Sequence, residues 1–170
     1  YNTGPLAGLR NVLINGNFKI WQRGTGPVEP TDGKQYLADR WLVRSSNGTG
    51  GSPTQQLFQD GNILKHRYTA VSLTDQCYLR QNIEAANIRP YAGTQMTLSF
   101  YASYAPTVSI AVTNSTDTST NITVNGSAAL PVVKDGDRYI CTFTVPVGQI
   151  ASAANLTGMN VFIYYDESAS

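Results

Sequence analysis

The sequence has 170 residues, of which 41% are hydrophobic and only 14% are charged, and its formal net charge is +1. This length suits one domain with a substantial core. Nucleic acid and an anionic membrane are disfavoured as partners, because a charge so close to zero creates no field that attracts phosphates.

The first ten residues, which include Gly4, Pro5 and Gly8, are expected to form an extended arm or linker. From residue 11 onward, apolar and polar residues alternate with a period of two, which is typical of half-buried strands. The clearest case is 94–104, where Met96 and Phe100 share one face. In chain order, the pattern predicts strands at 11–14, 18–22, 36–44, 54–58, 64–72, 76–84, 94–104, 108–112, 121–124, 139–145 and 159–165.

Turn-forming pairs separate these strands, among them Asn15-Gly16, Asn125-Gly126 and Asp135-Gly136. Helix is expected only as a turn or two within 83–88 and 147–155. Many short strands without intervening helices favour an all-β fold. We expect residues 11–170 to form a single antiparallel, two-sheet jelly-roll β-sandwich, because so many strands in one domain suit two stacked sheets better than a small closed barrel.

Two cysteines are present, Cys77 and Cys141, each within an alternating apolar run. We expect them to be small buried hydrophobic residues, with one disulfide as the less favoured alternative. His66 is the only histidine, so no metal site is expected, and the sequence indicates no cofactor.

Two segments carry a specific resemblance. Residues 11–24 are NVLINGNFKIWQRG and residues 36–41 are YLADRW. They resemble the jelly-roll domain of bacteriophage tail fibres and related virion surface proteins, in which an N-x-L-x-N-G-x-F-x-x-W-Q-R-G opening precedes an A-D-R-W segment. Residues 78–84 (YLRQNIE), 92–102 (AGTQMTLSFYA) and 139–146 (YICTFTVP) resemble later strands of that family.

The motif residues are expected to be structural. Two early tryptophans most often anchor a core, and Asp39 or Asp32 is a candidate ion-pair partner of Arg23 or Arg40. The family in turn resembles jelly-roll carbohydrate-binding modules, many of which hold calcium through an acidic residue after the N-G-x-F motif. This chain has Lys19 there. The structural motif consists of Asn15, Gly16, Phe18, Trp21, Arg23, Asp39, Arg40 and Trp41.

A sugar site needs aromatic rings and planar polar side chains on an outward sheet face. Tyr78 and Arg80 alternate out of phase with Leu79, and Tyr101 is out of phase with Phe100. We therefore expect Tyr78, Arg80 and Tyr101 to share one exposed face and bind carbohydrate. The alternative is that Tyr101 packs under a loop or in a subunit interface.

An enzymatic function is not expected. The lone histidine allows no Ser/His/Asp arrangement, and Asp39 with Glu84 is the one carboxylate pair worth testing for glycoside hydrolysis. Nucleotide-binding glycine motifs are absent from the sequence.

Two functions follow from the resemblance. The first is a virion surface domain, in a phage tail fibre or similar appendage, that recognises host surface polysaccharide; its affinity is expected to be weak and insensitive to salt. The second is a capsid or tail decoration or spike protein that binds other virion proteins. Both imply a protein made in the host cytoplasm and placed on the virion. The Gly/Pro arm and the end at Ser170, before the family's usual closing strand, favour a homotrimer or an assembly-bound protomer over a lone monomer.

Overall fold

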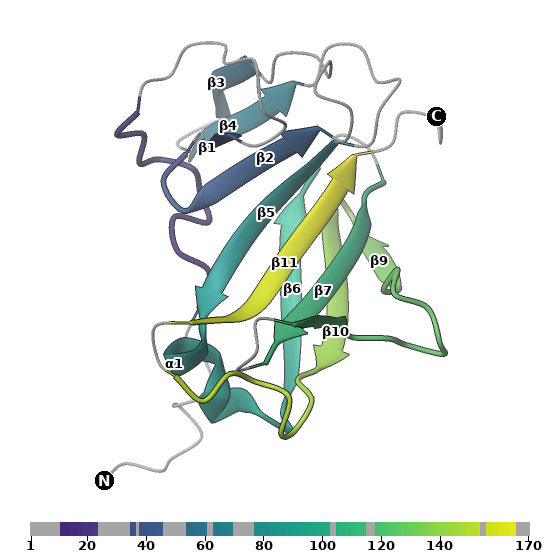
Figure 1. Ribbon diagram of the computed structural model, residues 1–170. Coiled ribbons are helices and arrows are strands. Elements are labelled where there is room, and N and C mark those ends of the chain that lie inside the picture. Colours follow the sequence, from purple (N-terminus) through teal and green to yellow (C-terminus); the bar gives the residue numbers. More distant parts are fainter. Residues whose placement is uncertain are drawn as a thin grey trace, which may run out of the picture.

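The chain forms two antiparallel sheets that enclose one core (Figure 1). The computed structural model describes residues 11–23, 35–36, 38–45, 54–60, 63–69, 77–102, 105–114, 118–153 and 156–165. Of these, only the backbone is described for residues 35, 43–45, 54–60, 63–69, 77 and 165. The larger sheet contains, in spatial order, β1 (Gln35–Tyr36), β2 (Trp41–Ser45), β5 (Cys77–Glu84), β11 (Thr157–Tyr165), β7 (Thr107–Thr113) and β8 (Ser119–Asn121).

The smaller sheet has the order β6 (Gln95–Tyr101), β10 (Arg138–Thr144), β9 (Val132–Asp135), and it lies behind the larger sheet in Figure 1. A separate hairpin pairs β3 (Thr54–Asp60) with β4 (Ile63–Thr69). The helical elements described are α1 (Ala85–Ile88) and the 3-10 turn η2 (Arg89–Tyr91). The predicted all-β, two-sheet antiparallel architecture is thus confirmed.

Alternation along the strands builds the core. In β5, Leu79 and Ile83 are buried while Tyr78, Arg80 and Asn82 are only partly so, which assigns the two faces of the larger sheet. The inner face of the smaller sheet contributes residues such as Leu98, Cys141 and Phe143 to the same core. The outer faces of the two sheets therefore point away from each other, which decides which residues can share a binding site.

Several strand predictions need correction. The predicted strand 36–44 is interrupted by a turn at 38–40 that separates β1 from β2, and the strand predicted at 121–124 is β8, which ends at Asn121. Residues 11–14 and 18–22 form turns and extended chain, because the side chain of Asn15 provides hydrogen bonds that a neighbouring strand would otherwise provide. Strand β9 was not predicted, since its Lys134-Asp135 end was assigned to a turn; the two-residue turn lies one position later, at Gly136 and Asp137, with Gly136 at φ 59°. The Asn125-Gly126 turn is confirmed, with positive φ at both residues.

Helix α1 packs closely on strand β11 at Gly158. A Cβ atom at that position would lie 2.5 Å from the Cα of Ala85 and 2.7 Å from a methyl carbon of Ile88. The backbone N–H of Ala85 donates to the carbonyl of Leu156 at 2.8 Å, which holds the two elements together. Only glycine allows the strand to approach the helix this closely.

Candidate functional site

The motif segment, residues 11–23, lies against the core and against the larger sheet. The side-chain oxygen of Asn15 accepts the N–H of Ile20 at 3.1 Å, and its amide nitrogen donates to the carbonyls of Ile20 and Asp39. The indole N–H of Trp41 donates to the carbonyl of Asn15 at 3.0 Å, and the Phe18 ring packs on Trp41 at 5.1 Å between centroids. These contacts join the two halves of the sequence motif.

Trp41 is 2% exposed and Trp21 is partly buried against the core. The Trp21 indole N–H donates to the carbonyl of Phe18. Three motif residues, Asn15, Phe18 and Arg40, have positive φ values between 53° and 73°. Gln22 and Arg23, at the end of this segment, line a pocket on the outer face of the larger sheet.

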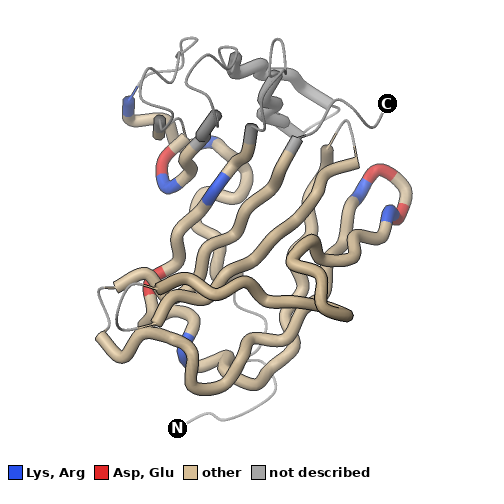
Figure 2. Tube along the Cα trace, turned by 45° about the vertical axis from the view of Figure 1, so that its right-hand side comes forward, with Lys and Arg blue, Asp and Glu red and all other residues tan. Residues whose placement is uncertain are grey.

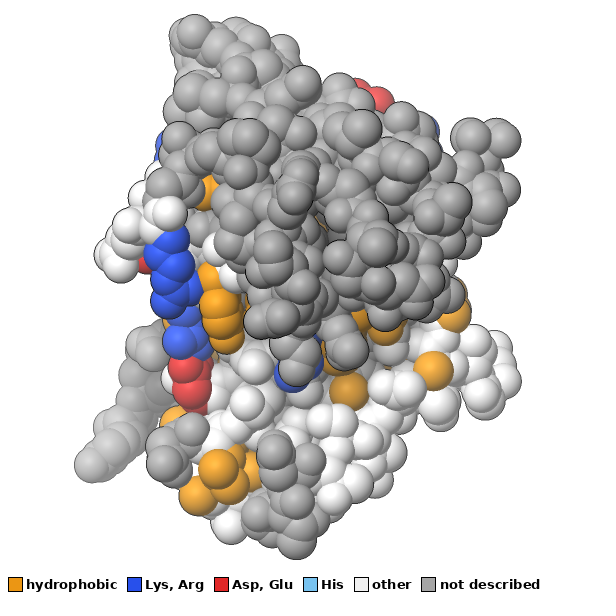
Figure 3. All heavy atoms as spheres, turned by 45° about the horizontal axis from the view of Figure 1, so that its top comes forward, with side chains coloured by type: hydrophobic (Ala, Val, Ile, Leu, Met, Phe, Trp, Pro, Cys, Tyr) orange, Lys and Arg blue, Asp and Glu red, His pale blue; other side chains and the backbone are white. Residues whose placement is uncertain are grey.

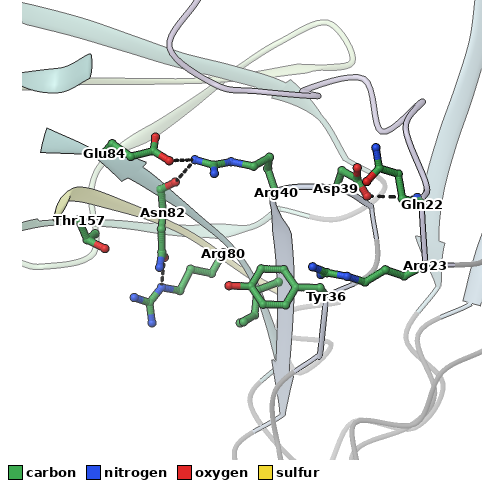
Figure 4. A pocket seen from close by; sticks show the side chains of 10 residues that line it. Gln22, Arg23, Tyr36, Asp39, Arg40, Arg80, Asn82, Glu84 and Thr157 are labelled. Atoms are coloured by element: carbon green, nitrogen blue, oxygen red, sulfur yellow. Dashed lines mark hydrogen bonds and ion pairs between the residues drawn. The ribbon is translucent and has the colours of Figure 1, made fainter. Parts of the chain in front are cut away.

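A pocket opens on that outer face, between the motif segment and strands β2 and β5 (Figure 4). Its volume of about 420 Å³ lies within the usual range of ligand sites, about 300–1,000 Å³. Figure 3 shows basic side chains in a column that ends on an acidic one, beside hydrophobic groups. The lining residues are Gln22, Arg23, Tyr36, Asp39, Arg40, Leu42, Arg80, Asn82, Glu84 and Thr157.

An ion pair between Arg40 and Glu84 forms one wall of the pocket. The guanidinium also donates to the backbone carbonyl of Asn82 at 3.4 Å. The hydrogen bond from Arg40 is the main reason why the pKa of the Glu84 carboxyl lies below its ordinary value. Asp39 instead accepts the backbone N–H of Gln22 at 3.1 Å. Arg40, which was a candidate ion-pair partner of Asp39, is therefore paired with Glu84.

Asp39 and Glu84 both line the pocket, as a carboxylate pair would in a glycosidase. Such an enzyme needs one carboxyl group whose pKa is raised so that it can protonate the leaving group. The pKa of Glu84 is shifted in the opposite direction by Arg40. Glu84 is therefore suited to hold Arg40 in place and poorly suited to act as a general acid.

Tyr36 presents an aromatic ring at the pocket. The residue is 45% exposed, and the guanidinium carbon of Arg23 lies 4.8 Å from the ring centroid. In the view of Figure 4, Arg23 lies on one side of this ring and Arg80 on the other. An exposed ring among planar polar side chains is the combination that stacks on a pyranose and hydrogen-bonds its hydroxyl groups.

Arg80 is held by amide groups. Its Nε donates to the side-chain oxygen of Asn82 at 2.6 Å, and its Nη2 donates to that of Asn160 at 2.8 Å. Asn160 is 1% exposed and donates in turn to Thr113 at 3.1 Å. The guanidinium also lies 5.2 Å from the centroid of the Phe162 ring, so its position is fixed from three directions.

Three half-buried aromatic residues continue the same face beyond Arg80. Tyr78 contacts Phe162 at 5.5 Å and Tyr164 at 5.3 Å, and Phe162 stacks on Tyr164 at 6.2 Å. The strand register places them together, since Tyr164 pairs with Tyr78 and Phe162 with Arg80. Burial raises the pKa of the Tyr164 hydroxyl, which indicates a packed environment for this cluster.

The three predicted sugar-binding residues do not share a face. Tyr78 and Arg80 lie on the outer face of the larger sheet, but Tyr101 ends β6 in the smaller sheet and is 67% exposed on the opposite side. The alternation that was used for the prediction gives the face of each strand, not the sheet to which the strand belongs. Arg80 lines the pocket, while Tyr78 and Tyr101 do not.

Further residues of the pocket were not predicted to bind ligand. Asn82 and Glu84 follow Arg80 at the same period of two, so extending the alternation along β5 would have found them. Tyr36 was noted only as the first residue of the YLADRW segment. Asn160 carried no local signal, because it meets Arg80 only through the pairing of β11 with β5.

Other site classes can be assessed for the described residues. Cys141 is a free, fully buried thiol whose pKa is raised by burial, as expected of a small hydrophobic residue; the Cys77 side chain and His66 lie outside the described side chains. The described residues include no cluster of His, Cys, Asp or Glu able to hold a metal ion. Within the same part of the chain, no helix is long and apolar enough to cross a bilayer.

Comparison of the chain with protein-family models, with curated proteins and with solved structures finds no match.

Proposed function

We propose that this chain is a jelly-roll domain of a virion surface appendage, such as a tail fibre, and that its pocket binds host cell-surface carbohydrate without catalysing a reaction. The virion setting rests on the motif resemblance of residues 11–24 and 36–41. The jelly-roll assignment is supported by the path of the chain, which passes between the sheets from β5 to β6, from β6 to β7, from β8 to β9 and from β10 to β11.

The observation that carries the proposal is the pocket on the outer face of the larger sheet, in which the exposed Tyr36 ring stands among amide and guanidinium groups. A pyranose offers an apolar face for the ring and hydroxyl groups for Gln22 and Asn82. The pocket walls are tied to the fold by Arg40, Asp39 and the motif segment. Such a site is largely formed before the ligand arrives, which reduces the entropic cost of binding.

Binding of the full chain to immobilised bacterial surface polysaccharides tests the proposal. Tyr36→Ala should abolish binding with little change in melting temperature, because an exposed ring contributes to the ligand more than to the core. Tyr101→Ala is the matched control: it removes a more exposed tyrosine from the opposite sheet, and it should leave binding intact. Absence of binding to every polysaccharide, or equal effects of the two substitutions, would contradict the proposal.

A second candidate function is assembly with other copies or with virion proteins through the smaller sheet. On its outer face, Val133 is 64% exposed and Tyr101 is 67% exposed. Val133 belongs to β9 and Tyr101 to β6, and Ile140 lies on β10, the strand between these two. Strand β9 also forms an edge of this sheet, and an edge can be covered by a neighbouring chain.

We expect the full chain to sediment as a trimer. The double variant with Val133→Asp and Tyr101→Ser should sediment more like a monomer, and each chain should still bind sugar. A wild-type protein that remains a monomer at micromolar concentration would contradict this assembly. Because the two surfaces lie on opposite sheets, the carbohydrate and assembly functions are separable by mutation.

A further inference from the structure

The charge of Arg80 is not neutralised within the described part of the chain. Its hydrogen-bond partners are the side-chain amide oxygens of Asn82 and Asn160, at 2.6 and 2.8 Å, and the ring beside it belongs to Phe162. The ion pair among the described residues is formed by Arg40 and Glu84 instead. An aspartate at position 82 or 160 would provide the same acceptor and a counter-charge, but this chain has asparagine at both.

The surrounding pocket also has more positive than negative groups. Guanidinium groups of Arg23, Arg40 and Arg80 line it together with the carboxylates of Asp39 and Glu84. Arg40 and Glu84 neutralise each other, and Asp39 accepts the backbone N–H of Gln22 on the far side of the pocket from Arg80 in Figure 4. Along the described part of the sheets, Figure 2 shows acidic positions to be sparse.

A fixed, half-buried guanidinium whose hydrogen-bond partners are neutral is suited to bind an anionic ligand. The amides and the Phe162 ring orient the planar group, and the N–H donors that they leave unused match a carboxylate with two parallel hydrogen bonds. Preorganisation of the donor means that little rotamer entropy is lost when the anion binds.

We propose that the pocket binds an acidic saccharide, one whose sugar rings carry carboxylates, and that Arg80 holds the carboxylate while Tyr36 contacts the ring. This inference rests on the proposed carbohydrate function and narrows it to uronic or sialic acid polymers. It also replaces the expectation of salt-insensitive binding drawn from the net charge of +1, because the charge at the pocket, not the sum over the chain, meets the ligand.

The first test compares each acidic polysaccharide with its own neutral form. Hyaluronate, polygalacturonate, alginate and polysialic acid are immobilised both as such and after chemical reduction of the carboxyl groups to primary alcohols, which keeps the sugar stereochemistry. Binding of the full chain to at least one native polymer should be stronger than binding to its reduced form by about tenfold or more, the size of one charge-assisted hydrogen bond. The preference should shrink as salt is raised.

The second test neutralises Arg80 without removing it. Asn82→Asp keeps the acceptor for Arg80 Nε and adds a carboxylate at the site, so the fold is retained while the preference for the native polymer is lost. Asn125→Asp makes the same chemical change in the exposed β-turn outside the pocket and should leave the preference unchanged. Melting temperatures of both variants establish that they fold.

The outcomes separate this inference from the function on which it rests. Equal binding to native and reduced polymers, or binding restricted to neutral polysaccharides, overturns the acidic ligand and leaves carbohydrate binding in place. Full retention of the preference by Asn82→Asp overturns the role of Arg80. No binding to native, reduced or bacterial surface polysaccharides overturns both proposals.

Discussion

The side-chain amide of Gln81 exchanges two hydrogen bonds, each 2.8 Å long, with the backbone N–H and C=O of Ile14. Gln81 is 1% exposed and faces the core from the middle of β5, 67 residues away from Ile14 in the sequence. A strand would satisfy these backbone groups through a ladder, but here one glutamine does so. This contact attaches the motif segment to the larger sheet and so helps to fix the wall of the pocket.

Gln81→Leu should lower the free energy of unfolding by about 1–3 kcal/mol, because it leaves the backbone groups of Ile14 without partners while preserving the side-chain volume. Urea denaturation measures the loss. Gln95→Leu, at an exposed position of β6, is the matched control and should change stability by less than about 0.5 kcal/mol. Similar losses in the two variants would show that Gln81 contributes no more than a surface glutamine.

Gly158→Ala should destabilise the protein by about 1–3 kcal/mol, since the new methyl group would overlap the backbone of α1 at Ala85. Thermal melting of the purified variant provides the measurement. At Gly16 a Cβ atom meets nothing closer than 4.0 Å, so Gly16→Ala serves as the control and should be tolerated. A neutral Gly158→Ala would mean that helix α1 moves away from the strand at little cost.

Phe143→Ala should cost about 3–5 kcal/mol of stability, as expected when a fully buried aromatic side chain is removed. Phe143 is 4% exposed, whereas Phe100, on the predicted core face of β6, is only partly buried and stacks on Tyr139 at 6.1 Å. Phe100→Ala should therefore cost less than Phe143→Ala in the same denaturation experiment. A larger loss for Phe100→Ala than for Phe143→Ala would place the centre of the core nearer to the C-terminal end of β6.

The ion pair between Arg40 and Glu84 should make stability depend on pH in the acid range. Because Arg40 lowers the pKa of Glu84 below its ordinary value of 4.5, the stabilisation is present above that pH and is lost as the pH falls through the lowered pKa. The difference in unfolding free energy between wild type and Glu84→Gln should therefore shrink on acidification. The pair is solvent-accessible, so the difference is modest and falls with added salt.

A double-mutant cycle supplies the control for this pH effect. In the Glu84→Gln background, Arg40→Gln should have a smaller effect on stability at neutral pH than it has in the wild type. Equal effects in both backgrounds, or a Glu84→Gln difference that grows on acidification, would exclude Arg40 as the cause of the shift.

Local alternation predicted many of the strands of this fold but not the site. Residues 94–104 and 139–145 show a period of two because one face of each strand is buried, and β6 and β10 form there. Residues 11–22 show a similar pattern, yet hydrogen bonds from Asn15 and Gln81 hold them in turns. The pattern indicates which residues are buried. It does not show whether the backbone groups of the segment are paired with a neighbouring strand or with side chains.

The site depended on contacts between distant segments. Alternation correctly placed Tyr78 and Arg80 on one face, because both belong to β5. Tyr101 was grouped with them although β6 pairs with β10, since the choice of sheet is made by long-range pairing. The amide partner of Arg80 on β11 lies 80 residues further along the chain, beyond any local pattern.

The central position of β11 has a consequence for the order of folding. This strand, residues 157–165, separates β5 from β7, so each of those strands lacks one of its two neighbours until β11 has been synthesised. Pairings of such high contact order form slowly, and their edges are exposed to wrong partners in the meantime. During translation the β6–β10 pairing can form first, and the larger sheet, with Asn160 behind Arg80, is completed last. Ligand binding should therefore appear only after β11 has been synthesised and has paired with β5.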